Sequence, residues 1–217
     1  LENNDFIFNE GTINNEGTIN NNQLLNNDGT LTNKEVTNPP NGYQEGTINN
    51  DGTITNNNML INRGTLENNY FIFNDGAITN EGDLNNNDTI NSYDIIINKN
   101  IITNDGTLDN HGTLNSSGTL DNSGTLNSYD IIINKNIITN DGTIFNQGTL
   151  NNQGTINNNQ LLDNDATIDN DGTIDNQGTI KNYDAINNYD TINSYDIIIN
   201  KNIITNHGTL NINGNLN

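Results

Sequence analysis

The chain has no cysteine and no tryptophan, and only two prolines, one methionine and six basic residues. Without cysteine it can form neither a disulfide framework nor a thiolate metal site. No apolar run is long enough to cross a bilayer, so membrane insertion is not expected. Because 27 acidic residues give a formal net charge of −21, repulsion would oppose binding to nucleic acid along the whole chain.

Hydrophobic residues are also scarce, at 30% of the 217 residues. Such a composition cannot build a conventional globular core and is typical of disordered chains. Ile and Leu nevertheless recur at a fixed spacing, and regular spacing lets a polar chain bury a continuous line of side chains. The chain begins without Met or an apolar leader, and we expect it to be a segment of a longer repeat protein or filament.

A six-residue repeat, G-T-[I/L]-x-N-x, runs through nearly the whole chain. It is seen in residues 11–16 and 148–153, and from Gly46 onward its phase never changes. The one break is the segment 35–45, where two prolines and an Asn-Gly pair predict a loop. A period of six alternates in a strand, so positions one, three and five should face inward together.

Each inward position has a physical role. Burial of the Ile or Leu at position three stabilises the fold by roughly 1.5 to 3 kcal/mol per residue. Position one is mostly Gly, Asp or Asn, which tolerate a left-handed backbone, and we expect it at a corner between strands. Position five is nearly always Asn, which predicts stacked amides bonded to the backbone at each turn. The predicted asparagine ladder includes Asn15, Asn50, Asn68, Asn104, Asn122, Asn140, Asn158 and Asn176.

The outward position two indicates how many units make one rung. Two, three or four units are conceivable, but only grouping by threes separates a mostly apolar row from a mostly threonine row. The apolar row reads Phe6, Leu24, Met59, Ala77, Ile95, Thr113, Ile131, Thr149, Thr167, Ala185 and Ile203. The threonine row reads Thr12, Thr30, Thr47, Thr65, Asp83, Ile101, Thr119, Ile137, Thr155, Thr173, Thr191 and Thr209.

The sequence therefore predicts an all-β fold, a single parallel β-solenoid. Its rungs should be triangular, with 18 residues in three units. It should form one continuous domain over residues 1–217, interrupted only by the loop at 35–45. Handedness is left open.

The apolar row predicts an assembly face, because a long exposed apolar stripe is unusual on a soluble monomer. Several rungs place a second apolar residue outward at position four. The predicted face comprises Phe6, Phe8, Leu24, Met59, Ile61, Ile95, Ile97, Ile131, Ile133 and Ile203. The motif around Ile95–Ile97 recurs with its third copy turned to another face. We expect lateral self-association, and end-to-end stacking as a further way to build a fibre.

No catalytic site, metal site or cofactor is predicted. The histidines, His111 and His207, have no Cys, His or Ser constellation around them, and Asp163, Asp169 and Asp175 should fall on three different faces. The alternative function is a ligand-binding solenoid, which would bind ice through its threonine ladders or would bind calcium. The competing interpretation is that threonine is simply a favourable outward residue of strands.

Strings of the form L-x-N-x-G occur at Leu108-Asp109-Asn110-His111-Gly112 and at residues 120–124. In these strings the chain resembles surface adhesins of the filamentous-haemagglutinin type. The resemblance implies a β-solenoid shaft at the cell surface or outside the cell. The expected function is therefore a structural, non-enzymatic shaft or fibre of an extracellular or cell-surface filament or adhesin.

Overall fold

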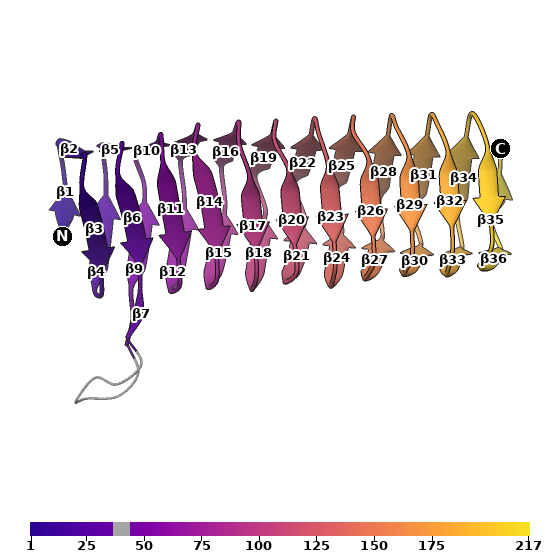
Figure 1. The fold of residues 1–217 in the computed structure, drawn as a ribbon, viewed down its shortest axis with the longest axis horizontal. Helices are drawn as coiled ribbons and strands as arrows, with labels where there is room; N and C mark the ends of the chain where they lie inside the picture. Colours follow the sequence, from indigo (N-terminus) through magenta and orange to yellow (C-terminus); the bar gives the residue numbers. More distant parts are fainter. Residues whose placement is uncertain (37–43) are drawn as a thin grey trace.

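A computed structural model describes residues 1–36 and 44–217, which form an all-β rod with the two ends of the chain at opposite ends (Figure 1). Three parallel sheets, here called A, B and C, run along the rod. Successive strands of the chain enter successive sheets, so each rung contributes one strand to each sheet. Ile102 lies beside Leu120, and ladder partners are 18 residues apart. The predicted rung of three units is confirmed.

Sheet A contains β1 (Glu2–Asn3), β4 (Thr18–Asn21), β9 (Thr47–Asn50), β12 (Thr65–Asn68), β15 (Asp83–Asn86), β18 (Ile101–Asn104), β21 (Thr119–Asn122), β24 (Ile137–Asn140), β27 (Thr155–Asn158), β30 (Thr173–Asn176), β33 (Thr191–Ser194) and β36 (Thr209–Ile212). Sheet B contains β2 (Phe6–Asn9), β5 (Leu24–Asn27), β10 (Thr53–Asn56), β13 (Phe71–Asn74), β16 (Thr89–Ser92), β19 (Thr107–Asn110), β22 (Thr125–Ser128), β25 (Thr143–Asn146), β28 (Leu161–Asn164), β31 (Thr179–Asn182), β34 (Ile197–Asn200) and β37 (Asn215–Leu216). Sheet C contains β3 (Thr12–Asn15), β6 (Thr30–Asn33), β11 (Met59–Asn62), β14 (Ala77–Asn80), β17 (Ile96–Asn98), β20 (Leu114–Ser116), β23 (Ile132–Asn134), β26 (Leu150–Asn152), β29 (Ile168–Asn170), β32 (Ile186–Asn188) and β35 (Ile204–Asn206).

The core runs along the axis and is built from aliphatic side chains, one from almost every strand of the three sheets. In β21, Leu120 is 0% and Asn122 is 1% exposed, whereas the alternating residues Thr119 and Asp121 are partly exposed. The same alternation recurs in strand after strand, and buried Ile and Leu from all three sheets make one cluster. A chain that is poor in hydrophobic residues thus buries nearly every position-three side chain, because each rung covers the next.

The glycines at position one have a different role from the one expected. None of the described glycines has a φ between +20° and +160°, so the prediction of a left-handed corner was wrong for them. From Gly29 onward, the position where each described glycine would carry a Cβ is instead occupied by the backbone of the preceding rung. A Cβ at Gly118 would come within 1.9 Å of the carbonyl oxygen of Asn100, so the lack of a side chain permits close stacking at the corner.

The segment predicted as a loop is an insertion at the corner between sheets C and A. Its ends form the antiparallel strands β7 (Glu35–Val36) and β8 (Gln44–Glu45), and β7 leaves the body of the rod between β6 and β9 (Figure 1). The remainder of the predicted loop, residues 37–43, lies outside the described residues.

The rung resumes directly after the insertion. The amide of Gly46 donates a hydrogen bond of 2.7 Å to the carbonyl of Lys34, and Thr18 pairs with Thr47 in sheet A. The insertion therefore adds no strand to the three long sheets. The prediction that residues 35–45 take the place of two repeat units was therefore wrong. It assigned every residue before the insertion to the wrong sheet relative to the residues after it.

Candidate assembly site

The outward side chains of sheet C form a largely apolar surface, which we call face C. Its apolar members are Met59, Ile61, Ala77, Ile95, Ile97, Ile131 and Ile133. Polar residues interrupt it at Thr79 in β14 and at Thr113 and Asn115 beside and in β20. These rungs are in register, because β11 pairs with β14 and the series continues through β17 and β20 to β23. Met59 is 39% exposed, and the isoleucines are partly exposed.

Three residues of the predicted assembly face lie elsewhere. Phe6 and Phe8 are in β2 and Leu24 is in β5, all on sheet B, and the two Phe rings stack at 6.2 Å. The insertion at 35–45 explains this error. Counting it as two repeat units moves every earlier residue two strands along the rung and hence onto another sheet. Ile203 does border sheet C, but the polar rungs of β26, β29 and β32 separate it from Ile133. The third copy of the apolar motif lies on sheet B, as expected, at Ile197–Ile199.

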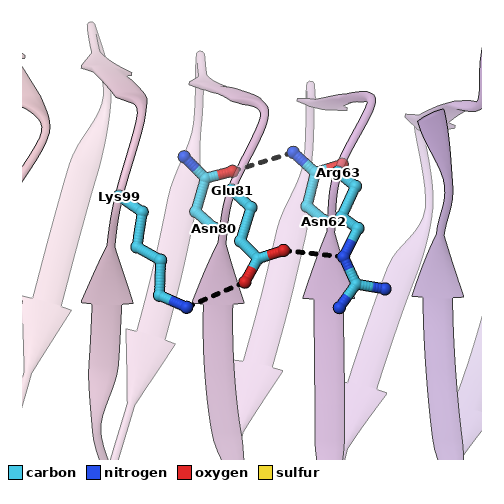
Figure 2. A network of polar contacts seen from close by, with 5 residues as sticks. All are labelled: Asn62, Arg63, Asn80, Glu81 and Lys99. Carbon is cyan, nitrogen blue, oxygen red and sulfur yellow. Dashed lines mark hydrogen bonds and ion pairs between the residues drawn. The ribbon is translucent and has the colours of Figure 1, made fainter. Parts of the chain in front are cut away.

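The corner between sheets C and A carries four of the six basic residues, Lys34, Arg63, Lys99 and Lys135, and we call it the basic edge. Glu81 lies between two of them, with its carboxylate 2.6 Å from Arg63 Nε and 2.8 Å from Lys99 Nζ (Figure 2). Hydrogen bonds from Lys99 and from Arg63 lower the pKa of Glu81, and the bond from Lys99 has the larger effect. Within the described residues Lys135 makes no ion pair.

The residues at position two do not reveal this edge, because its charged side chains are at position six. Sorting position six by threes places Arg63, Glu81, Lys99 and Lys135 in one column. A second column of position six carries Tyr93, His111 and Tyr129 at the corner between sheets B and C. Their rings stack face to face, with centroids 4.6 Å and 4.3 Å apart.

The asparagine ladders are buried at the inner ends of the strands. In sheet A the ladder runs unbroken from Asn3 to Ser194 and includes seven of the eight predicted members: Asn50, Asn68, Asn104, Asn122, Asn140, Asn158 and Asn176. Asn15 belongs instead to the ladder of sheet C, where it donates to Asn33 at 2.9 Å. Again the insertion accounts for the difference.

The ladders of sheets B and C are interrupted where serine replaces asparagine. In sheet C, Ser116 Oγ accepts from Asn98 but donates to the carbonyl of Gly118 rather than to Asn134. In sheet B, Asn110 Oδ1, Ser128 Oγ and Asn146 Oδ1 are buried without a hydrogen-bond partner in the described residues. Serine has a single hydroxyl proton, so it cannot replace the two donors of an amide.

Comparisons with protein-family models, with curated proteins and with solved structures gave no significant match. Among residues 1–36 and 44–217 there is no helix long and apolar enough to span a membrane. No three His, Cys, Asp or Glu side chains in that part of the chain are grouped so as to hold a metal ion.

The remaining candidate residues are dispersed. Asp163, Asp169 and Asp175 lie on sheets B, C and A respectively, as the rung size predicts. His207 stacks on Tyr189 at 5.4 Å. Threonines are in register on sheet A from Thr155 to Thr209 and on sheet B from Thr89 to Thr143, whereas Thr12 and Thr30 lie on sheet C.

Proposed function

We propose that the chain is a structural, non-enzymatic shaft segment of an extracellular or cell-surface fibre, and that its rods associate side by side through face C. The observation that carries the proposal is the apolar surface from Met59 to Ile133, which nothing in the described chain covers. Apolar side chains that recur in register along several rungs are typical of an interaction surface rather than of scattered exposure.

The partner that best fits face C is a second copy of this chain. Three strands of face C, β11, β17 and β23, are each followed directly by a basic residue: Arg63, Lys99 and Lys135. Positive charge therefore borders the apolar surface. The chain as a whole is acidic, with a formal net charge of −21. Repulsion between two rods is therefore smallest where the basic edge of one meets the acidic surface of another, and such complementarity would fix their relative position.

The architecture supports the role of a shaft. Each rung contacts only its neighbours, so the number of repeats sets the length of the rod without changing its cross-section. His111 lies within an aromatic stack and His207 beside Tyr189, which supports a packing role for both. The resemblance to adhesin shafts supports the location at the cell surface or outside the cell.

The test is the particle size of a variant in which Ile95, Ile97, Ile131 and Ile133 are replaced by Thr. We expect multi-angle light scattering to show assemblies for the unaltered chain and single rods for the variant. The matched control is Ile101→Thr with Ile137→Thr on sheet A, where each side chain is 38% exposed. Equal particle size for all three proteins, or equal loss of assembly in the control, would contradict the proposal.

A further inference from the structure

A groove of about 260 Å³ lies along sheet B and the adjoining corner, beside the end of the aromatic stack. Its floor comes from the outward position four of three consecutive rungs, Asn127, Phe145 and Asp163, which are in register. Its rim comes from position six, where Tyr129 and Tyr183 are separated by the rungs of Gln147 and Asp165. The groove thus joins three aromatic rings to carboxylate and amide groups.

The aromatic rings are available to a ligand. Tyr129, Phe145 and Tyr183 are 42%, 43% and 40% exposed. Tyr129 ends the stack, since only its partner His111 packs on it at 4.3 Å. The exposed parts of such rings offer apolar surface against which the flat face of a ligand can pack.

The polar groups that the groove offers to a ligand are Asn127, Gln147, Asp163 and Asp165. Ser128 and Asn146 also border it, but they are only 1% and 2% exposed and belong to the buried ladder. Burial raises the pKa of Asp163 and the nearby charge of Lys181 opposes that shift, so this carboxylate is partly removed from water. Hydrogen bonds to such groups are stronger than on an open surface.

The charges around the groove restrict the class of ligand. Two carboxylates, on Asp163 and Asp165, oppose an anion such as a phosphate or sulfate. A cationic ligand would meet two ammonium groups already in place. Lys181 Nζ lies 3.9 Å from Asp163 Oδ2, and Lys201 Nζ lies 4.1 Å from the centroid of the Tyr183 ring. A neutral ligand with apolar faces and many hydroxyl groups avoids both conflicts.

We propose that this groove binds a neutral pyranose unit of a glycan. The C–H face of the sugar would pack on Tyr129 and Phe145, and its hydroxyl groups would donate to Asp163 and Asp165 and exchange hydrogen bonds with Gln147. The floor of the groove lies on sheet B and its rim at the corner between sheets B and C. None of its residues belongs to face C, so sugar binding and lateral assembly are tested by different substitutions.

The test is binding of the intact chain to an array of immobilised neutral and acidic glycans, followed by calorimetric titration with each neutral oligosaccharide that is bound. We expect neutral hexose-containing glycans to bind, and Tyr129→Ala or Asp165→Asn to weaken binding by about tenfold or more. The controls are Tyr70→Ala and Asp105→Asn, which remove an exposed ring and an exposed carboxylate outside the groove.

Because the substituted side chains are exposed, circular dichroism should show the same fold for all four variants. The proposal is overturned if no neutral glycan binds, or if the groove variants bind as well as the controls. It is also overturned if tetramethylammonium, used as a cationic probe, binds the groove more tightly than every neutral sugar.

Discussion

The side-chain amide of Asn104 donates a hydrogen bond of 2.7 Å to the amide oxygen of Asn122, 18 residues later in the chain. The same nitrogen also lies 2.9 Å from the carbonyl oxygen of Thr125. One buried amide thus joins two rungs and satisfies the backbone of the corner that follows. Because each asparagine lies in one rung and donates hydrogen bonds to the next, the ladder holds neighbouring rungs together, as the aliphatic core also does.

Replacing Asn122 by Ala should destabilise the rod by roughly 2 to 4 kcal/mol. The change leaves Asn104 without its acceptor and Asn140 and the Thr143 carbonyl without a donor, and each buried group left unpaired costs about 1 to 3 kcal/mol. Urea denaturation followed by circular dichroism measures the loss. Asn159→Ala, which removes an exposed amide bonded to Asp141, should cost less than about 0.5 kcal/mol. Similar losses in both variants would contradict this role of the ladder.

Restoring asparagine at an interruption should have the opposite effect. In a Ser128→Asn variant the new amide can donate to Asn146 Oδ1 and accept from Asn110, two groups that are incompletely paired now. We expect a gain of about 1 kcal/mol in the free energy of unfolding. Ser117→Asn, at an exposed corner position, should leave the stability unchanged. A lower denaturation midpoint for Ser128→Asn would mean that the cavity cannot hold the larger side chain.

The corner glycines should tolerate a methyl group only where the preceding rung leaves room. A Cβ at Gly118 would lie 1.9 Å from the Asn100 oxygen, whereas one at Gly17 would have nothing within 4 Å. Gly118→Ala should therefore cost about 1 to 3 kcal/mol through overpacking, and Gly17→Ala should be neutral or stabilising by less than about 1 kcal/mol. Thermal melts of the two variants distinguish steric crowding from a backbone preference, which would penalise both.

The ion pairs of Glu81 make a pH-dependent contribution. Its pKa is lowered in the folded state, first by the hydrogen bond to Lys99, so the stabilisation is present above the unfolded pKa and is lost as pH falls through the folded pKa. A Glu81→Gln variant should melt slightly lower than the unaltered chain at neutral pH. The two melting curves should converge in acid, and high salt should reduce the difference at neutral pH. A difference that persists in acid would indicate packing rather than charge.

Much of this structure follows from alternation within the repeat. Leu120 and Asn122 could be placed inside the rod because a six-residue period in strands has a fixed inward set, and the segregation of outward residues gave the three-unit rung. Alternation does not reveal whether a break in the repeat fills part of a rung, so Phe6, Leu24 and Asn15 were placed one column away from their true neighbours.

Alternation also does not explain why residue 118 is glycine, since the close contact of Gly118 with Asn100 depends on how the rungs stack. The groove at Tyr129 and Asp165 combines positions four and six, and only the folded rung brings them together.

The insertion itself provides a direct test of the rung count. Lys34 and Gly46 are already joined by a backbone hydrogen bond of 2.7 Å, and they occupy the corner positions that Arg63 and Gly64 occupy one rung later. Deleting residues 35–45 should therefore leave all three sheets in register, with an unchanged or slightly higher denaturation midpoint because a closed loop is removed. Deleting residues 119–121 removes Leu120 and most of β21. It should lower the free energy of unfolding by at least the burial of a core residue, roughly 2 kcal/mol or more. If the segment were part of a rung, its deletion would instead turn the strands before it onto new partners. Asn26 would then lose its place beside Thr55 on sheet B, which a shifted amide resonance of Thr55 in ¹H–¹⁵N NMR spectra would detect.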